Sequence, residues 1–144
     1  MPTALLPAGP TRGPRAVAAL FARLAGGAVF VVFGLGKFVN RASEIESFRD
    51  YGLPAPEAFV AVIGVLELVG GVLLILGLAT RPAALLLAGD MVGAIIVSGI
   101  ALGEPISLTF APAELLVCLF LLWTGPGAYA LDHRVSGSPG RAPG

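Results

Sequence analysis

Residues 63–81, with the sequence IGVLELVGGVLLILGLATR, form a continuous apolar run that contains one carboxylate, Glu67. The surrounding stretch, residues 58–78, has 21 residues and would be about 31 Å long as a helix, which matches the hydrocarbon thickness of a bilayer. A charged group near the middle of such a span costs about 2.5–3.5 kcal/mol on insertion scales, so it usually faces protein, water or a partner charge. Glu67 is therefore the first candidate for a polar site inside a membrane helix.

The composition of the whole chain is that of an integral membrane protein. Hydrophobic residues make up 56% of the 144 residues and charged residues only 12%, far from the balance of soluble domains. The nine basic and nine acidic residues cancel, and no basic stretch is long enough to indicate nucleic-acid binding. Cys118 is the only cysteine and His133 the only histidine, so we expect no disulfide, no metal site and no haem.

Four apolar segments predict four transmembrane helices, which makes the expected fold all-α: an integral membrane four-helix bundle with up-down topology. The link after the first segment is long enough to begin with an amphipathic helix, because Ile45 and Phe48 lie three residues apart. Proline and glycine then end that helix before the second span. The predicted spans are residues 18–39, 58–78, 82–102 and 108–123.

The membrane domain is expected to occupy residues 16–127, as a single domain. Residues 1–15 are predicted to be a disordered basic tail, and residues 128–144 a flexible cytoplasmic tail rich in glycine and proline. Basic residues set the orientation, since they are enriched on the cytoplasmic side. One side would have six (Arg12, Arg15, Arg23, Arg81, Arg134 and Arg141) and the other three (Lys37, Arg41 and Arg49), which predicts that both termini are cytoplasmic in a bacterial inner membrane.

Four ionisable side chains fall inside the predicted spans: Lys37, Glu67, Asp90 and Glu114. At a rise of 1.5 Å per residue, the carboxylates lie roughly 9–13 Å from the nearer membrane surface, and the lysine stem can reach them. We therefore expect the four groups to form one buried polar cluster.

Two interpretations of this cluster stay open. Lys37 and Glu67 could form a neutralising ion pair that only locks the bundle, because buried charges in membranes are commonly paired. Three carboxylates exceed one lysine, however, and unless Arg23 or Arg41 reaches in, at least one carboxyl group should hold a proton at neutral pH. Such a group is a candidate proton relay or a hydrogen-bond donor to a quinone carbonyl.

Small residues accompany each charge and predict close helix contacts. Glycines recur at three- and four-residue steps beside Lys37 and Glu67, and a G-x-x-x-G pattern flanks Asp90. The predicted packing glycines are Gly34, Gly64, Gly71, Gly89 and Gly93.

The order of several short motifs resembles the DoxX family of small bacterial membrane proteins. The motifs are GLGKF at residues 34–38, GLP at 52–54, ELVGG at 67–71, GLATR at 77–81, Met91 with Ala94, and GPGAYALD at 125–132. The resemblance covers about residues 23–132 and implies a four-helix membrane bundle linked to redox assemblies. The related DoxD proteins belong to a thiosulfate:quinone oxidoreductase, and mycobacterial DoxX is associated with a membrane oxidoreductase complex and oxidative-stress defence.

The chain departs from the family near the end of the third span, where members often have a histidine and this sequence has Ser98 and Gly99. That departure weakens any histidine-based cofactor or proton role. Three functions are compared: an accessory or quinone-contacting subunit of a membrane redox complex, a small proton-coupled transporter, and a non-catalytic membrane scaffold. We favour the first, with an oxidoreductase as partner and quinone as the ligand, over a stand-alone enzyme; a homo-oligomer is compatible with all three.

Overall fold

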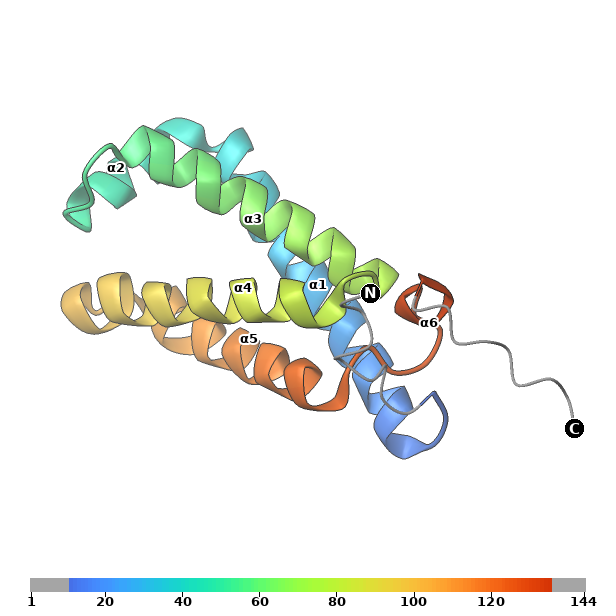
Figure 1. Cartoon of the computed structure of the whole chain (residues 1–144). Helices are drawn as coiled ribbons and strands as arrows, with labels where there is room; N and C mark the ends of the chain where they lie inside the picture. Colours follow the sequence, from blue (N-terminus) through green and yellow to red (C-terminus); the bar gives the residue numbers. More distant parts are fainter. Residues whose placement is uncertain (1–10, 136–144) are drawn as a thin grey trace, which may run out of the picture.

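Proline and glycine set the limits of the helices, and the computed structural model describes residues 11–135 (Figure 1). Helices α1 (Pro14–Val39), α3 (Pro56–Leu76) and α5 (Pro105–Thr124) each begin at a proline. Proline is suited to a first helical turn, where its missing N–H has no helical acceptor to lose. Within the described residues these three helices, together with residues 80–100, are long and apolar enough to cross a membrane.

The third span is a composite of α4 (Thr80–Ala94) and η2 (Ile95–Ile100), a π-helical turn that continues it. A short helix, α2 (Arg41–Asp50), follows α1 as the amphipathic pattern predicted, and α6 (Asp132–Val135) follows α5. The all-α four-span fold is therefore confirmed. The first and fourth spans begin earlier than predicted, at Pro14 and Pro105.

The four spans form two helix pairs. α1 packs most extensively against α3, and α4 against α5. The pairs approach each other near α6 and diverge towards the end of the molecule that holds α2 (Figure 1). We call the end near α6 the closed end and the end near α2 the open end.

Glycines bring the α1 and α3 backbones into close contact. A Cβ atom on Gly34 would lie 2.6 Å from the backbone nitrogen of Leu68, and one on Gly71 would lie 2.7 Å from the carbonyl oxygen of Gly27. Gly64 lies on the same contact, beside Lys37. Side chains at these positions would push the two helices apart.

The predicted packing role of Gly89 and Gly93 is wrong within this chain. A Cβ atom on either residue would meet no atom of the described structure within 4 Å. Both glycines border an internal cavity instead. The G-x-x-x-G spacing indicates only that a close approach is sterically allowed, and here the facing helix lies too far away to use it.

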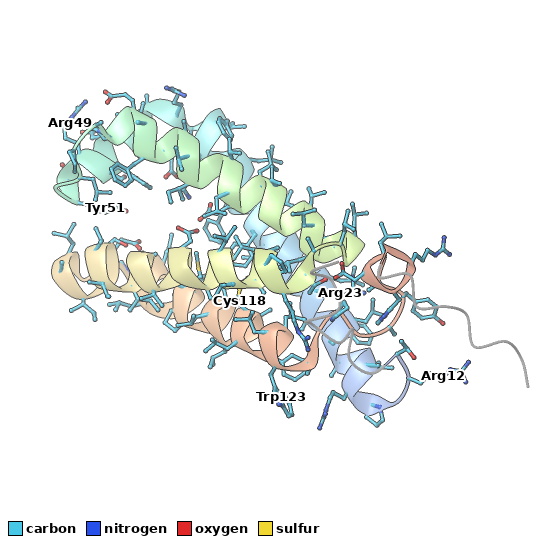
Figure 2. The ribbon with its side chains drawn as sticks, viewed as in Figure 1. Arg12, Arg23, Arg49, Tyr51, Cys118 and Trp123 are labelled. Atoms are coloured by element: carbon cyan, nitrogen blue, oxygen red, sulfur yellow. The ribbon has the colours of Figure 1, made fainter. Side chains whose placement is uncertain are left out.

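The closed end is held by Arg23, whose side chain is completely buried (Figure 2). Its Nε donates to the carbonyl oxygen of Pro126 at 2.6 Å and its Nη2 to that of Ala128 at 2.7 Å. Its Nη1 donates to the carbonyl oxygens of Leu74 and Ile75, both at 3.1 Å. These last two carbonyls belong to the final turn of α3, which carries the negative end of the helix dipole, and the Leu74 carbonyl also accepts a hydrogen bond from the Gly77 N–H at 3.1 Å. One guanidinium thus joins α1, α3 and the segment after α5.

The segment after α5 is packed, so the prediction of a flexible tail from residue 128 is wrong for the part that the structure describes. Ala128 N–H donates to the Ala16 carbonyl at 3.1 Å. Asp132 accepts hydrogen bonds from the backbone N–H groups of Ala79 at 2.7 Å and Thr80 at 3.0 Å, which caps the start of α4. Residues 136–144 and 1–10 lie outside the described residues.

We predict that Gly34→Ala destabilises the protein by about 1–3 kcal/mol, because the added methyl group overpacks the α1–α3 contact. Gly36→Ala is the matched control, since a Cβ atom there meets nothing within 4 Å. Thermal unfolding in detergent micelles measures both variants. Equal unfolding temperatures for the two variants would contradict the close contact.

We predict that Arg23→Lys lowers the unfolding free energy by about 1.5–3 kcal/mol for each hydrogen bond lost, because an ammonium group cannot reproduce the planar fork of the guanidinium. Arg12→Lys, at an exposed position, is the control and should leave the unfolding temperature unchanged. The same measurement in detergent applies. An unaltered unfolding temperature in Arg23→Lys would show that the carbonyl contacts contribute little.

Candidate functional site

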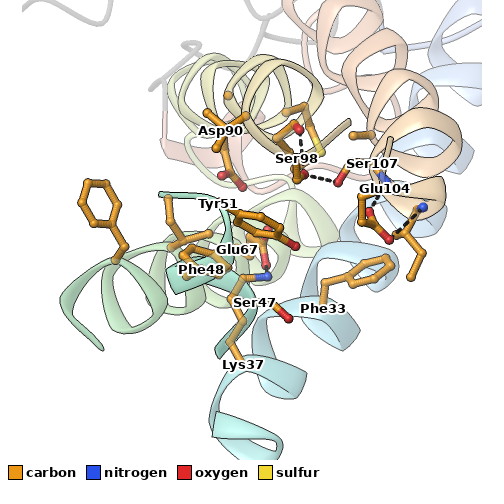
Figure 3. Close-up of a pocket in the computed structure, with 18 of the residues that line it drawn as sticks. Phe33, Lys37, Ser47, Phe48, Tyr51, Glu67, Asp90, Ser98, Glu104 and Ser107 are labelled. Atoms are coloured by element: carbon orange, nitrogen blue, oxygen red, sulfur yellow. Dashed lines mark hydrogen bonds and ion pairs between the residues drawn. The ribbon is translucent and has the colours of Figure 1, made fainter. Parts of the chain in front are cut away.

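A cavity of about 550 Å³ lies between the two helix pairs and reaches the open end (Figure 3). All four spans and α2 contribute to its wall. Much of the wall is aromatic, and the rings belong to Phe30, Phe33, Phe48, Tyr51, Phe59 and Phe110. A mostly apolar cavity of this size with a few polar groups is typical of a site for a small organic ligand.

An ion pair between α1 and α3 forms the polar part of the wall. Lys37 Nζ lies 2.9 Å from Glu67 Oε2, and the two residues are only 8% and 4% exposed. Gly64 lies one turn before Glu67 and leaves room for the lysine stem, whose Cβ would be 3.2 Å from a Cβ on the glycine. The ammonium and carboxylate groups therefore neutralise each other inside the membrane span.

Asp90 and Glu114 are the two carboxylates that lack this compensation. Asp90, on α4, interacts electrostatically with both Glu67 and Lys37, yet its Oδ2 is buried without a hydrogen-bond partner. Glu114, on α5, is 8% exposed and its Oε2 is likewise buried without a partner. Buried polar atoms nearly always have a partner, so two such atoms at one cavity point to a ligand or a proton.

The structure thus brings all four predicted ionisable residues to the wall of one cavity. Neither of the two other cations considered as partners reaches it. Arg23 is engaged at the closed end, and Arg41 is exposed on α2. Among the described residues, Lys37 is the single cation on the cavity wall. The functional role of the four residues stays a prediction.

Two serines form a second polar patch that sequence reasoning missed. Ser98 Oγ donates to the Ala94 carbonyl at 2.8 Å, and it also lies 2.5 Å from Ser107 Oγ in a hydrogen bond for which either hydroxyl can be the donor. The π-helical turn widens the helix at Ser98 and places it opposite the start of α5. Single serines in apolar spans carry little sequence signal, and the π-helical turn has none, so only the structure joins them.

Glu104 and Tyr51 lie at the open end of the cavity. Glu104 caps α5 by accepting hydrogen bonds from the backbone N–H groups of Ile106 at 3.1 Å and Ser107 at 2.7 Å. Burial opposes the effect, but these hydrogen bonds hold the pKa of Glu104 below its usual value. Burial raises the pKa of the Tyr51 hydroxyl, and nearby carboxylates, Glu104 first, raise it further.

No group of three or more histidine, cysteine or carboxylate side chains suited to a metal ion occurs in residues 11–135. His133 lies far from the cavity, at the closed end, where its Nε2 is 2.6 Å from the Gly127 carbonyl oxygen. Cys118 is buried in the apolar core.

Comparison with known proteins gives the family. The family model for DoxX matches residues 18–99, from α1 into η2. The chain belongs to the DoxX family. The matched region includes Lys37, Glu67 and Asp90, whereas Glu114 lies beyond it. No solved structure matches the chain.

Relatives of this DoxX protein come from several bacteria, and two of those compared are described as membrane proteins. The uncharacterized membrane protein Rv3486 of Mycobacterium tuberculosis is 36% identical, over 86% of this chain and 83% of its own. The putative oxidoreductase CatD of Bacillus subtilis is 37% identical, over 83% and 87%. The inner membrane protein YphA of Escherichia coli is 31% identical, over 83% and 91%. With its four candidate spans, the chain is therefore a multi-pass membrane protein.

We predict that Lys37→Glu and Glu67→Lys each destabilise this DoxX protein by about 3–5 kcal/mol, because each leaves like charges facing each other in the span. The double variant restores an ion pair and should recover most of the loss. A double-mutant cycle of unfolding free energies in detergent measures the coupling. Additive losses in the double variant would contradict a direct stabilising pair.

Proposed function

We propose that this DoxX protein is a quinone-contacting subunit of a bacterial membrane redox complex. The observation that carries the proposal is the cavity itself, which is lined by aromatic rings, by the Lys37–Glu67 pair and by Asp90. A quinone ring is flat and apolar except for its carbonyl oxygens, so it suits aromatic walls with one patch of hydrogen-bond donors.

The polar patch has chemistry suited to a quinone. The Lys37 ammonium has three donors and Glu67 occupies one of them, which leaves donors for a carbonyl oxygen. Asp90 Oδ2 is free to carry a proton, and reduction of a quinone takes up two protons with its two electrons. The electron-carrying cofactor is assigned to a partner protein, and the name of the CatD relative, a putative oxidoreductase, supports a redox context.

The proposal includes an orientation. In the described residues the closed end has five basic residues (Arg12, Arg15, Arg23, Arg81 and Arg134), whereas the open end has three (Lys37, Arg41 and Arg49). By the positive-inside rule the closed end would lie on the cytoplasmic side of the inner membrane, with both termini. Arg15 over the Trp123 ring, 4.5 Å from its centroid, is typical of an interfacial anchor at that end. The cavity would then open to the outer half of the bilayer.

Quinone binding is tested with decylubiquinone and purified protein by isothermal titration calorimetry. Lys37→Met combined with Glu67→Gln removes the charges as a pair, and we expect its affinity to fall about tenfold, the equivalent of one lost hydrogen bond. Arg49→Gln, an exposed change on α2, should leave the affinity unchanged. Wild-type protein that binds no quinone would overturn the proposal.

The charge-swapped variant separates a ligand site from a scaffold. Lys37→Glu combined with Glu67→Lys keeps an ion pair but moves the cation to the other helix. We expect it to keep stability and to lose quinone affinity, because the donor no longer occupies the same place. Full recovery of both stability and quinone affinity would favour a scaffold role for the ion pair.

Purification of the protein from native membranes should also recover an oxidoreductase, and absence of an oxidoreductase would exclude the role as a subunit of a redox complex.

A further inference from the structure

The described wall of the cavity holds more carboxyl groups than cations, and the quinone proposal does not explain this excess. The single cation on its described wall, Lys37, is already paired with Glu67. Four carboxylates are left over. They run from the open end to the interior: Glu44, Glu104, Asp90 and Glu114.

We propose that this cavity binds lipophilic organic cations, molecules in which a positive centre is surrounded by aromatic or aliphatic groups. The cavity wall has carboxyl groups without partners, which would bind the positive centre, and aromatic rings, which would contact the apolar groups around it.

Glu114 gives the strongest support for a cationic ligand. It is 92% buried, given its 8% exposure, and its Oε2 has no hydrogen-bond partner. Its neighbours are apolar or small: a Cβ on Gly26 would lie 3.4 Å from Oε2, and Cys118 follows one turn later. Asp90 Oδ2, on the neighbouring helix α4, is the second buried oxygen without a hydrogen-bond partner. Both residues line the same cavity, so a positive centre bound there would compensate them.

Aromatic rings line the route to these carboxylates. Phe33 of α1 and Phe110 of α5 meet edge to face across the cavity, with ring centroids 6.1 Å apart and an interplanar angle of 63°. Phe48 of α2 and Tyr51, which directly follows that helix, form a second pair, with ring centroids 5.4 Å apart. Ring faces attract cations, and the attraction grows when the cation is desolvated. The cavity volume of about 550 Å³ is suited to a ligand of drug size.

Charge at the open end favours entry of cations. Glu104 accepts two backbone hydrogen bonds that stabilise its ionised form, and Glu44 of α2 lines the same end. Carboxylates around a cleft with low-dielectric walls focus the field and raise the local concentration of cations. Glu44 and Glu104 would therefore attract cations to the open end, and Asp90 and Glu114 would bind them further inside the cavity.

This binding activity goes beyond the proposed function, because a quinone is neutral. A lipophilic cation would compete with the quinone for space but would bind through Asp90 and Glu114, whereas the quinone carbonyl would bind through Lys37 and use Asp90 only as a proton carrier. Loss of one activity therefore does not entail loss of the other.

The test uses two probes of matched size and opposite charge, tetraphenylphosphonium and tetraphenylborate. Purified protein in neutral detergent is titrated with each by isothermal titration calorimetry. We expect saturable binding of the phosphonium and none of the borate. Asp90→Asn combined with Glu114→Gln should weaken phosphonium binding at least about tenfold, since neither amide can ionise to compensate the bound cation. Glu46→Gln, an exposed carboxylate on α2 outside the cavity wall, is the control and should bind like wild type.

Two results would overturn the proposal. Equal binding of both probes would show that apolar surface alone attracts them. Unchanged phosphonium affinity in the folded double variant would show that the carboxylates are not its partners. If the double variant does not fold, Glu114→Gln alone replaces it, and the comparison of the two probes on wild-type protein needs no variant. Quinone binding that persists without phosphonium binding would leave the proposed function intact.

Discussion

The architecture depends on the guanidinium group of Arg23, because it joins the parts of the chain that meet at the closed end. Its N–H groups donate to two carbonyls in the last turn of α3 and to two carbonyls of the segment after α5. Arg23 therefore connects α1 both to its partner helix α3 and to the segment that follows the second helix pair. In a bilayer a buried backbone carbonyl has no water to accept from, so this arrangement satisfies the charge and the carbonyls together. Asp132 completes it by capping α4.

The two helix pairs are joined at the closed end and diverge towards the open end. The α1–α3 pair is held by backbone contact at glycines such as Gly34 and Gly71, so it stays narrow along its length. The α4–α5 pair shares no comparable contact with it towards the open end, where Gly89 and Gly93 border empty space. The cavity is therefore a consequence of unequal packing between the two pairs, and α2 lies at its entrance (Figure 1, Figure 3).

The two ends of the bundle differ in how their buried charged groups are compensated. At the closed end the charge of Arg23 is satisfied by four backbone carbonyl groups of the chain. At the cavity Lys37 and Glu67 satisfy each other, but Asp90 and Glu114 retain oxygens without one. A protein that only needed stability would gain by replacing these carboxylates with apolar residues of similar size. Their presence beside aromatic walls is what supports a ligand in the cavity.

The sequence by itself determined the membrane class, the four spans and the set of ionisable residues, because hydropathy and cost of burial depend on local composition. It also predicted α2 from a three-residue spacing. The role of Arg23, the packing of residues 128–135 and the Ser98–Ser107 contact were decided only by the tertiary structure. Each joins segments far apart in the chain, or depends on a π-helical turn, and periodicity carries no record of such contacts. The same holds for Gly89 and Gly93: spacing shows that two helices are able to approach closely, but only the arrangement of the other spans decides whether they do.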